Sequence, residues 1–340
     1  MSKINVLIAG STGYIGVQLI NLLIKHKKIN IKYLCGNSSV GKDISSYEKS
    51  LRNKNLPKII KFNEHLLKDV EIIFTALPNG EAQLISKKLS KKNILIDLAA
   101  DFRLNTASSY QKWYKKAHKV PELIKKSIYS LPELTGDKIK KFQIIGCPGC
   151  YPTSILIPII PLIKKNLIRK DSIIIDSKSG YSGAGRGVHK KYKNKNLYES
   201  ISAYGVGFHR HNSEIEQMIK NYTKKKFKFT FTPHLSPMFR GILTTIYVDL
   251  ARGKTINNLF NELKKFYKKE KFVKIAKLNS FVSTNDVINT NNCKISICKS
   301  KYKDKAIILS SIDNLIKGGA GQAIQNMNIL KNFDINEGLR

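Results

Sequence analysis

The segment IIGCPGCYPTS, residues 144–154, contains two cysteines, Cys147 and Cys150, in a C-x-x-C spacing. This spacing serves three chemistries: a redox dithiol, half of a zinc site, or one nucleophilic thiol beside a cysteine without function. The chain has no second C-x-x-C and no C-x-x-C-H, so a four-ligand zinc site lacks half of its ligands. We therefore predict no metal site, and the other two chemistries remain open.

The residues after Cys150 favour it as the nucleophile. An apolar run punctuated by prolines follows, and Pro152 suits a first helical turn. Cys150 is then expected at or just before a helix N-terminus, where unpaired backbone N–H groups favour the thiolate. Cys147 is expected on the incoming loop, where it gains less. A small buried hydrophobe is the alternative interpretation of either cysteine, but Gly149 and Pro152 at a domain junction favour a nucleophile.

A thiol nucleophile needs an acid or base, and the segment GFHRHNSEIEQ offers His209 and His211. A helix pattern begins near Asn212 or Ser213. Alternate residues of an extended segment point to the same side, so both imidazoles are expected together. A surface loop is the alternative. The remaining histidines lack such a setting: His234 is expected in a core or loop, and His26, His65, His118 and His189 are expected to be solvated.

The segment GSTGYIG, residues 10–16, stands between the first predicted strand and the first predicted helix. Glycines there let backbone amides approach a pyrophosphate. The spacing is G-x-x-G-x-x-G rather than G-x-G-x-x-G, so an ordinary glycine-rich turn is the alternative. The residues expected to contact a dinucleotide are Gly10, Ser11, Thr12, Gly13, Tyr14 and Ile15.

The end of the second predicted strand indicates which dinucleotide binds. NAD enzymes carry an acidic residue there for the ribose hydroxyls. This chain has CGNSSVGK instead, and Asn37, Ser38, Ser39 and Lys42 suit a 2′-phosphate. NADP is therefore favoured over NAD, with a polar surface loop as the alternative.

Two further segments combine cations with small residues or an acid. KSGYSGAGRG, residues 178–187, could bind an anion through backbone amides with Lys178 or Arg186. DLAADFRL places Asp101 and Arg103 at the end of another predicted strand. Each of these signals is weak by itself.

The elements that must position these residues change character along the chain. Residues 4–100 alternate strands (4–10, 29–35, 70–78 and 93–100) with helices (14–26 and 80–90), which predicts a parallel α/β sheet. The strands at 172–179, 227–235, 241–250 and 305–315 are closer together and predict an α+β domain with a mixed sheet. We predict a Rossmann-like domain at 1–149, completed by a C-terminal helix within 318–340, and a catalytic domain at 150–317.

Composition excludes several classes of protein. A hydrophobic fraction of 42% suits a globular chain, and no apolar run approaches the roughly 20 residues that span a bilayer. The N-terminal segment enters a strand directly, so we expect no signal peptide and a cytoplasmic location. An odd number of cysteines, five, argues against a disulfide framework. We expect Cys35, Cys293 and Cys298 to be small buried hydrophobes.

The net charge of +36 invites a nucleic-acid hypothesis. The excess is mostly Lys and is scattered over nearly every predicted surface helix, with no basic stripe and no aromatic platform. Lys, Asn and Ile share AT-rich codons, and codon bias explains all three excesses. We therefore predict no nucleic-acid partner, although a positive field would attract phosphorylated substrates.

Nine segments, in order, resemble the N-acetyl-γ-glutamyl-phosphate reductases, the NADPH-dependent enzymes of arginine biosynthesis. They run nearly end to end: GSTGYIG, LPNG, DLAADFR, SLPEL, PGCYPT, KSGYSGAGR, HRHNSEIEQ, TPHLSPMFRGIL and GGAGQAIQNMN. The resemblance implies reduction of an acyl phosphate to an aldehyde through a cysteine thioester, with NADP(H) as cofactor. It also implies a homo-oligomer, dimer or tetramer, formed through the catalytic domain, and no membrane partner.

The resemblance also implies roles for individual residues. Cys150 matches the nucleophile, and His211 is expected to be the acid/base. Substrate contacts are expected from His209, Arg103, Lys178 and Arg186. Cofactor contacts are expected from the glycine loop, Asn37 and Ser38, and also from Pro78, Gly183 and Gln322. The chain departs from the family at Cys147, which is usually Asn, and at Ser213, which is usually Pro.

Three alternatives remain. A related acyl-phosphate reductase, such as an aspartate-semialdehyde dehydrogenase, shares the architecture and chemistry. A C-x-x-C redox or metal module without catalysis would need both cysteines equally. A nucleic-acid binder would show steep salt dependence.

Overall fold

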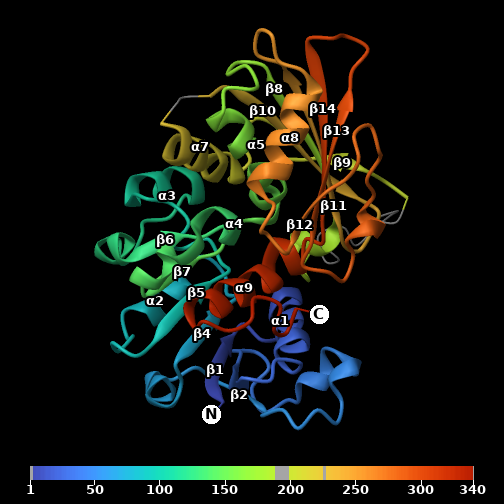
Figure 1. Cartoon of the computed structure of the whole chain (residues 1–340). Coiled ribbons are helices and arrows are strands. Elements are labelled where there is room, and N and C mark those ends of the chain that lie inside the picture. The colour runs from blue at the N-terminus through green and yellow to red at the C-terminus, as the bar shows by residue number, and fades with distance from the viewer. Residues whose placement is uncertain (1–2, 188–198, 225–226, 340) are drawn as a thin grey trace. The chain divides into compact units, whose positions relative to one another are not determined.

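The computed structural model describes residues 3–187, 199–224 and 227–339 (Figure 1). Its contacts divide the chain into two compact units. The first unit comprises residues 1–148 and 319–340, and the second comprises residues 149–318. The cofactor-binding and catalytic functions expected of these units stay predictions.

The first unit is built on a parallel sheet with the strand order β3-β2-β1-β4-β5-β7-β6. The strands are β1 (Ile4–Ala9), β2 (Ile29–Cys35), β3 (Ile59–Ile60), β4 (Ile72–Thr75), β5 (Ile94–Asp97), β6 (Ser127–Tyr129) and β7 (Ile144–Gly146). The helices are α1 (Tyr14–Leu23), α2 (Glu81–Ser86), α3 (Ala107–Tyr114), α4 (Pro132–Thr135) and α9 (Gly321–Leu330). The α/β prediction is confirmed, because strands buried on both faces read as continuous apolar runs.

The glycines of the β1–α1 loop permit two close approaches of backbone to backbone. Gly10 has φ +86°, and a Cβ there would lie 2.3 Å from the carbonyl oxygen of Ala76, after β4. A Cβ on Gly16 would lie 2.2 Å from the carbonyl oxygen of Gly10. The loop therefore folds tightly against the sheet and α1. At Gly13 there is more space, because a Cβ there would lie 3.6 Å from the carbonyl oxygen of Gly10.

The prediction of solvated histidines is wrong for His26 and His118. Helix α1 ends at Leu23, not at His26, and the His26 Nε2 lies 3.0 Å from the Asn328 Oδ1. The His118 Nε2 lies 2.9 Å from the carbonyl oxygen of Asp101. Both rings are buried because each Nε2 has one of these partners and each Nδ1 accepts a backbone N–H, from Lys28 for His26 and from Val120 for His118. His65 is exposed as expected, and His189 lies outside the described residues.

The second unit contains the predicted mixed sheet, with the order β12-β13-β14-β11-β8-β10-β9. The pairs β8–β10 and β12–β13 are parallel, and the other pairs are antiparallel. The strands are β8 (Ile173–Gly180), β9 (Ser202–Ala203), β10 (Phe229–Ser236), β11 (Ile242–Asp249), β12 (Val273–Ile275), β13 (Cys293–Lys299) and β14 (Lys305–Ile312). The helices are α5 (Cys150–Lys164), α7 (His211–Thr223) and α8 (Ile256–Phe266).

Helix α5 packs on one face of this sheet through buried hydroxyls. The Ser154 Oγ lies 2.7 Å from the Thr244 Oγ1, which lies 2.8 Å from the Ser177 Oγ. Further along α5, Pro161 has no N–H to donate to the carbonyl of Ile157. The Tyr267 hydroxyl, just after α8, donates to that carbonyl at 2.6 Å.

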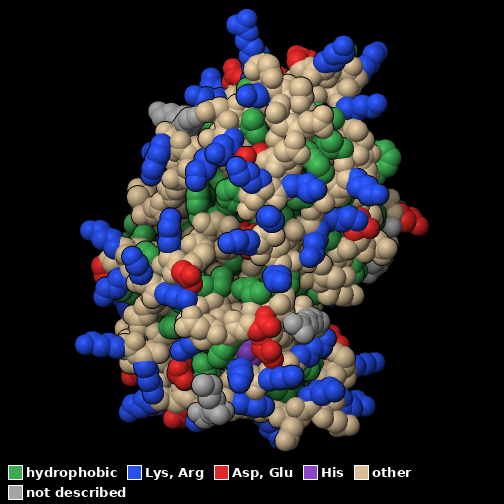
Figure 2. Space-filling model, viewed as in Figure 1, with side chains coloured by type: hydrophobic (Ala, Val, Ile, Leu, Met, Phe, Trp, Pro, Cys, Tyr) green, Lys and Arg blue, Asp and Glu red, His purple; other side chains and the backbone are tan. Residues whose placement is uncertain are grey.

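The surface is strongly basic. Figure 2 shows Lys and Arg side chains spread over the whole visible face, with few Asp and Glu and no single stripe. In the described part of the chain, every helix is too short or too polar to cross a membrane.

Replacing Tyr267 by Phe tests the contribution of its hydroxyl to α5. We expect the free energy of unfolding to fall by about 1–3 kcal/mol, because a buried carbonyl loses its donor. Urea unfolding followed by circular dichroism measures the change. Tyr302→Phe is the matched control, since Tyr302 is 60% exposed between β13 and β14. Equal losses from both variants would contradict the assigned role.

Candidate active site

Helix α5 begins at Cys150, which confirms the predicted position of this cysteine at a helix N-terminus. Gly149 is the N-cap, with extended backbone (φ −66°, ψ 157°). Cys150 is partly exposed, while Tyr151 to Ile163 are buried. The start of α5 therefore presents a partly exposed thiol at a helix N-terminus, the setting that favours a thiolate.

His211 lies directly against this helix start. Helix α7 begins at His211 itself, one residue earlier than expected, so His211 is the first helical residue and not part of an extended segment. A Cβ on Gly149 would lie only 2.4 Å from the His211 Nε2. The imidazole thus occupies space that any side chain at 149 would fill, next to the residue that carries the thiol.

Glu214, for which the sequence patterns predicted no role, connects these two parts. Its carboxylate is fully buried. Oε2 accepts the backbone N–H of Gly149 at 2.9 Å, and Oε1 lies 3.8 Å from the His211 Nε2. The spacing H-x-x-E places both side chains on one face of α7 and was the available signal.

His209 is surrounded by rings. Its ring centroid lies 4.6 Å from that of His211, 5.4 Å from that of Tyr204 and 5.7 Å from that of Tyr151. The His209 Nδ1 accepts the backbone N–H of His211 at 3.2 Å. Burial, followed by the nearby charge of Arg210, lowers the pKa of His209 to about 4. His209 is therefore neutral near pH 7, and its Nε2 carries the proton.

The His209 and His211 imidazoles therefore lie together as expected, but His211 is the first residue of α7 rather than part of an extended segment. A thiol, an imidazole and a buried carboxylate at two helix starts can perform nucleophilic attack with general acid–base assistance.

The three predicted substrate cations lie in different settings. Lys178 forms an ion pair with Asp176, which also lies 3.3 Å from the His234 Nδ1. Ser177 points towards α5, so by strand alternation Lys178 points to the opposite face of the sheet. The structure therefore does not bring Lys178 together with Cys150.

The other two cations belong to different units. Arg103, in the first unit, is nearly buried and donates from Nη2 to the carbonyl of Leu98 at 2.9 Å. Arg186, in the second unit, is exposed.

Cys147 has the opposite environment to Cys150. It is 1% exposed, and its Sγ lies 3.7 Å from the Asn326 Nδ2. Burial, together with the charge of Asp97, raises the pKa of the Cys147 thiol to about 12. Both cysteines are free thiols, and the expectation that Cys35, Cys293 and Cys298 are buried is confirmed.

A cavity in the first unit begins at the glycine loop. Gly10, Asn37, Lys61 and Lys88 are among the residues that line it. The Lys88 Nζ forms an ion pair with the Glu64 Oε2 at 2.8 Å. Lys61 lies in no motif that predicted a cofactor contact. Gly10 and Gly36, the uncharged side chain of Asn37 and the two lysines fit a dinucleotide with an additional phosphate, and Glu64 and Glu81 also line the cavity.

The remaining residues predicted to contact the cofactor have different exposures. Ser11 and Gln322 are buried, and the Ser11 Oγ donates to the carbonyl of Cys35 at 3.1 Å. Thr12, Gly13, Tyr14 and Ile15 are half-buried, and Ser38, Pro78 and Gly183 are exposed. Their contacts with the cofactor stay predictions.

Comparison with known proteins decides the family. Residues 5–142 match the NAD binding domain of semialdehyde dehydrogenases, and residues 150–314 match their dimerisation domain. The N-acetyl-gamma-glutamyl-phosphate reductase of Clostridium beijerinckii is 44% identical, over 100% of this chain and 98% of its own. The chain belongs to the N-acetyl-γ-glutamyl-phosphate reductase family. The reductase of Brachyspira hyodysenteriae, another member, is 41% identical over 99% of this chain and 98% of its own.

Solved structures show that this reductase family shares its fold with other semialdehyde dehydrogenases. Aspartate semialdehyde dehydrogenase II of Vibrio cholerae matches with a TM-score of 0.72 at 16% identity, over 98% of this chain and 99% of that one. The Candida albicans enzyme, solved with NADP, matches with a TM-score of 0.65 at 17% identity, over 97% and 99%. At these identities the likeness establishes the fold alone.

The lowered pKa of His209 predicts a pH-dependent stability. The unfolded chain takes up a proton near the ordinary value of 6.5, whereas the folded chain does so only near 4. Stability from this group is therefore full above pH 6.5 and is lost as pH falls towards 4. His209→Asn keeps an acceptor for the His211 N–H but cannot titrate. The stability advantage of wild type over this variant should shrink by about 2–3 kcal/mol across this window.

Urea unfolding at pH 4.5 and at pH 7 provides the measurement. His65→Asn is the control, because it removes an imidazole that is exposed on the surface. Parallel pH profiles for wild type and His209→Asn would rule out the shifted titration.

Proposed function

We propose that this chain reduces N-acetyl-γ-glutamyl phosphate to N-acetylglutamate 5-semialdehyde and phosphate with NADPH, a step of arginine biosynthesis. The observation that carries the proposal is the end-to-end identity with reductases of that name. The arrangement of Cys150, His211 and Glu214 supports the same chemistry, because it provides the parts that a thioester mechanism needs.

The first half of the reaction uses the start of α5. The Cys150 thiolate attacks the γ-acyl carbon of the substrate, and a tetrahedral oxyanion forms. Backbone N–H groups at a helix N-terminus stabilise this negative charge. The carbon–oxygen bond to phosphate then breaks, and phosphate leaves with the electron pair, so a thioester remains on Cys150.

The second half uses His211. Bound NADPH supplies the hydride that reduces the thioester to a thiohemiacetal. The His211 imidazole lies beside the start of α5 and can donate a proton to the oxygen that becomes negative. It takes the proton back when the thiohemiacetal collapses to the semialdehyde and releases the thiolate. The buried carboxylate of Glu214 lies 3.8 Å from the His211 Nε2 and places a negative charge beside the imidazole.

The environment of His209 favours a supporting role beside the expected substrate contact. A neutral ring that accepts the backbone N–H of His211 and packs against Tyr151 and Tyr204 holds the first turn of α7 in place. The candidates for binding substrate anions are Arg103 and Arg186, with Lys178 less favoured by its orientation.

Aspartate semialdehyde is the alternative substrate, because solved structures of aspartate semialdehyde dehydrogenases share this fold. Their identities of 16% and 17% support only the shared fold, while relatives above 40% identity carry the acetylglutamyl name. A side-by-side assay with both semialdehydes separates the two substrates.

We also propose that the protein is a cytoplasmic homo-oligomer, a dimer or tetramer formed through the second unit. The match to a dimerisation domain over residues 150–314 supports oligomerisation. Ile174 on β8 and Tyr247 on β11 are register partners, 52% and 43% exposed. An uncovered sheet face with large apolar side chains suits a second copy.

The cysteine variants test the nucleophile and the reaction together. Wild type should form NADPH from NADP⁺, phosphate and N-acetylglutamate semialdehyde, only when phosphate is present. Cys150→Ser should lower kcat by at least about 1000-fold, because a hydroxyl is a far weaker nucleophile. Cys147→Ser should keep activity within about threefold, since a buried Ser can still accept from Asn326.

Two results would count against this assignment. A wild-type protein inactive with this semialdehyde would exclude the substrate. Equal losses from Cys147→Ser and Cys150→Ser would instead favour the redox dithiol.

Lys61→Ala tests the expected phosphate contact of the cofactor. Loss of one charge-assisted hydrogen bond should raise the KM for NADP⁺ about tenfold and leave the KM for NAD⁺ unchanged. Lys58→Ala is the matched control, because Lys58 is exposed and does not line the cavity. Equal changes for both cofactors would exclude a contact with the 2′-phosphate.

A further inference from the structure

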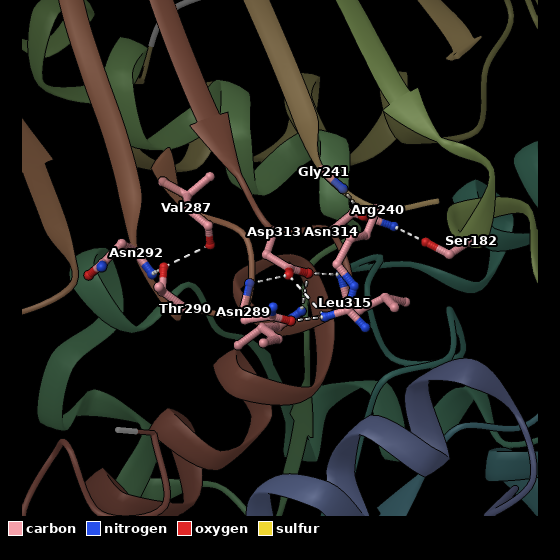
Figure 3. A network of polar contacts seen from close by, with 11 residues as sticks. Ser182, Arg240, Gly241, Val287, Asn289, Thr290, Asn292, Asp313, Asn314 and Leu315 are labelled. Atoms are coloured by element: carbon pink, nitrogen blue, oxygen red, sulfur yellow. Dashed lines mark hydrogen bonds and ion pairs between the residues drawn. The ribbon is translucent and has the colours of Figure 1, made fainter. Parts of the chain in front are cut away.

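Asp313, directly after β14, holds a fully buried carboxylate at the centre of a polar network (Figure 3). Oδ1 accepts the backbone N–H groups of Leu315 and Ile316 at 2.9 and 3.1 Å. Oδ2 accepts the backbone N–H of Asn289 at 2.9 Å and the Arg240 Nη1 at 3.2 Å. A buried charge is expensive unless it is paired and hydrogen-bonded, and here both conditions are met.

The network fixes the turn that follows β14. The side chain of Asp313 caps the N–H groups at the start of this turn, and its carbonyl accepts the N–H of Gly318 at 2.9 Å. Residues Ile316–Ala320 form a short π-helical turn, η8, a conformation often found at functional sites. Asp313 therefore holds the segment from 315 to 318 through both its backbone and its side chain.

Gly318 in turn lies against Cys150. A Cβ on Gly318 would be 2.7 Å from the Cys150 Cβ and 3.2 Å from its Cα. The backbone of Gly318 is thus a wall beside the thiol-bearing carbon, and this wall restricts the directions in which the Cys150 side chain can point.

Asn314 extends the same support to the glycine-rich loop. Its Oδ1 accepts the N–H of Gly241 at 2.6 Å, and its Nδ2 donates to the Ser182 Oγ at 2.9 Å. Ser182 belongs to η6 (Tyr181–Ala184), the segment in which Gly183 is expected to contact the cofactor. Two consecutive side chains therefore hold the Gly318 wall and this loop.

We propose that Asp313 is a positioning residue for Cys150, acting through the 315–318 turn and the Gly318 backbone. The inference rests on the proposed role of Cys150 as the nucleophile. The Arg240 guanidinium compensates the charge of Asp313, and the carboxylate keeps the Gly318 wall where it limits the thiol to its productive orientation.

Asp313→Asn tests this proposal with almost no change in volume. The Asn Oδ1 can still cap Leu315 and Ile316, but its Nδ2 would face two donors, the Asn289 N–H and the Arg240 Nη1. We expect kcat to fall about tenfold while the KM values for NADP⁺ and phosphate stay within about twofold. With the wall displaced, iodoacetamide should alkylate Cys150 at least about threefold faster, as measured by peptide mass spectrometry.

The buried cysteines distinguish positioning from general loosening. Cys293 and Cys298 are buried in β13 of the same unit and should stay unlabelled in Asp313→Asn. Asp249→Asn is the matched control, because it removes a carboxylate that pairs with Lys305 at the far end of β14. It should leave kcat and the Cys150 rate unchanged.

The proposal is overturned if the Cys150 rate in Asp313→Asn does not rise, if kcat does not fall, or if Cys293 is labelled in parallel. Should this variant fail to fold, Gly318→Ala leaves the carboxylate network in place and pushes a methyl group onto Cys150. Its kcat should fall about tenfold with Cys293 unlabelled, and an unchanged kcat would equally overturn the proposal. Alkylation needs no substrate, so a wild type without reductase activity would refute the proposed function but not the positioning.

Discussion

The carboxylate of Glu214 is the interaction on which the arrangement around Cys150 depends. One oxygen accepts the N–H of Gly149, the N-cap of α5, and the other lies beside the His211 imidazole. A fully buried carboxylate is stable only with such partners, so α5 and α7 must meet where both are within reach. The same contact that satisfies the charge also places the thiol and the proton carrier at adjoining helix starts.

This arrangement also requires residues without side chains at two positions. At Gly149 a Cβ would enter the His211 ring, and at Gly318 it would enter the Cys150 side chain. Neither glycine has positive φ, so neither is needed for backbone conformation. Both are required because the reacting groups pack directly on peptide backbone, which keeps the space around the thiol small and its orientation defined.

The sequence was informative where structure depends on local patterns. Strands β1, β2 and β8 follow their apolar runs, and Cys150 begins a helix because the prolines and apolar residues after it specify one. Strand alternation could also have revealed the orientation of Lys178, since Ser177 is the buried neighbour.

Long-range partners explain what local patterns could not predict. His26 is buried because Asn328, 302 residues away, pairs with it. Asp313 gave no signal because its partners, Asn289 and Arg240, belong to other segments. Glu214 was overlooked for another reason: a buried acid on an amphipathic helix looks like a solvated one until its partner is placed.

Cys147 and Cys150 show why the C-x-x-C spacing alone could not assign a function to either residue. A redox dithiol needs a thiolate to form readily, yet burial beside Asp97 holds the pKa of Cys147 near 12. Asn326 satisfies the Cys147 sulfur in the interior by donating from its Nδ2. Cys150 lies at a helix start, partly exposed, with an imidazole beside its N-cap. Since thiol reactivity follows the fraction of thiolate and its accessibility, the environments separate two residues that the C-x-x-C pattern treats as equivalent.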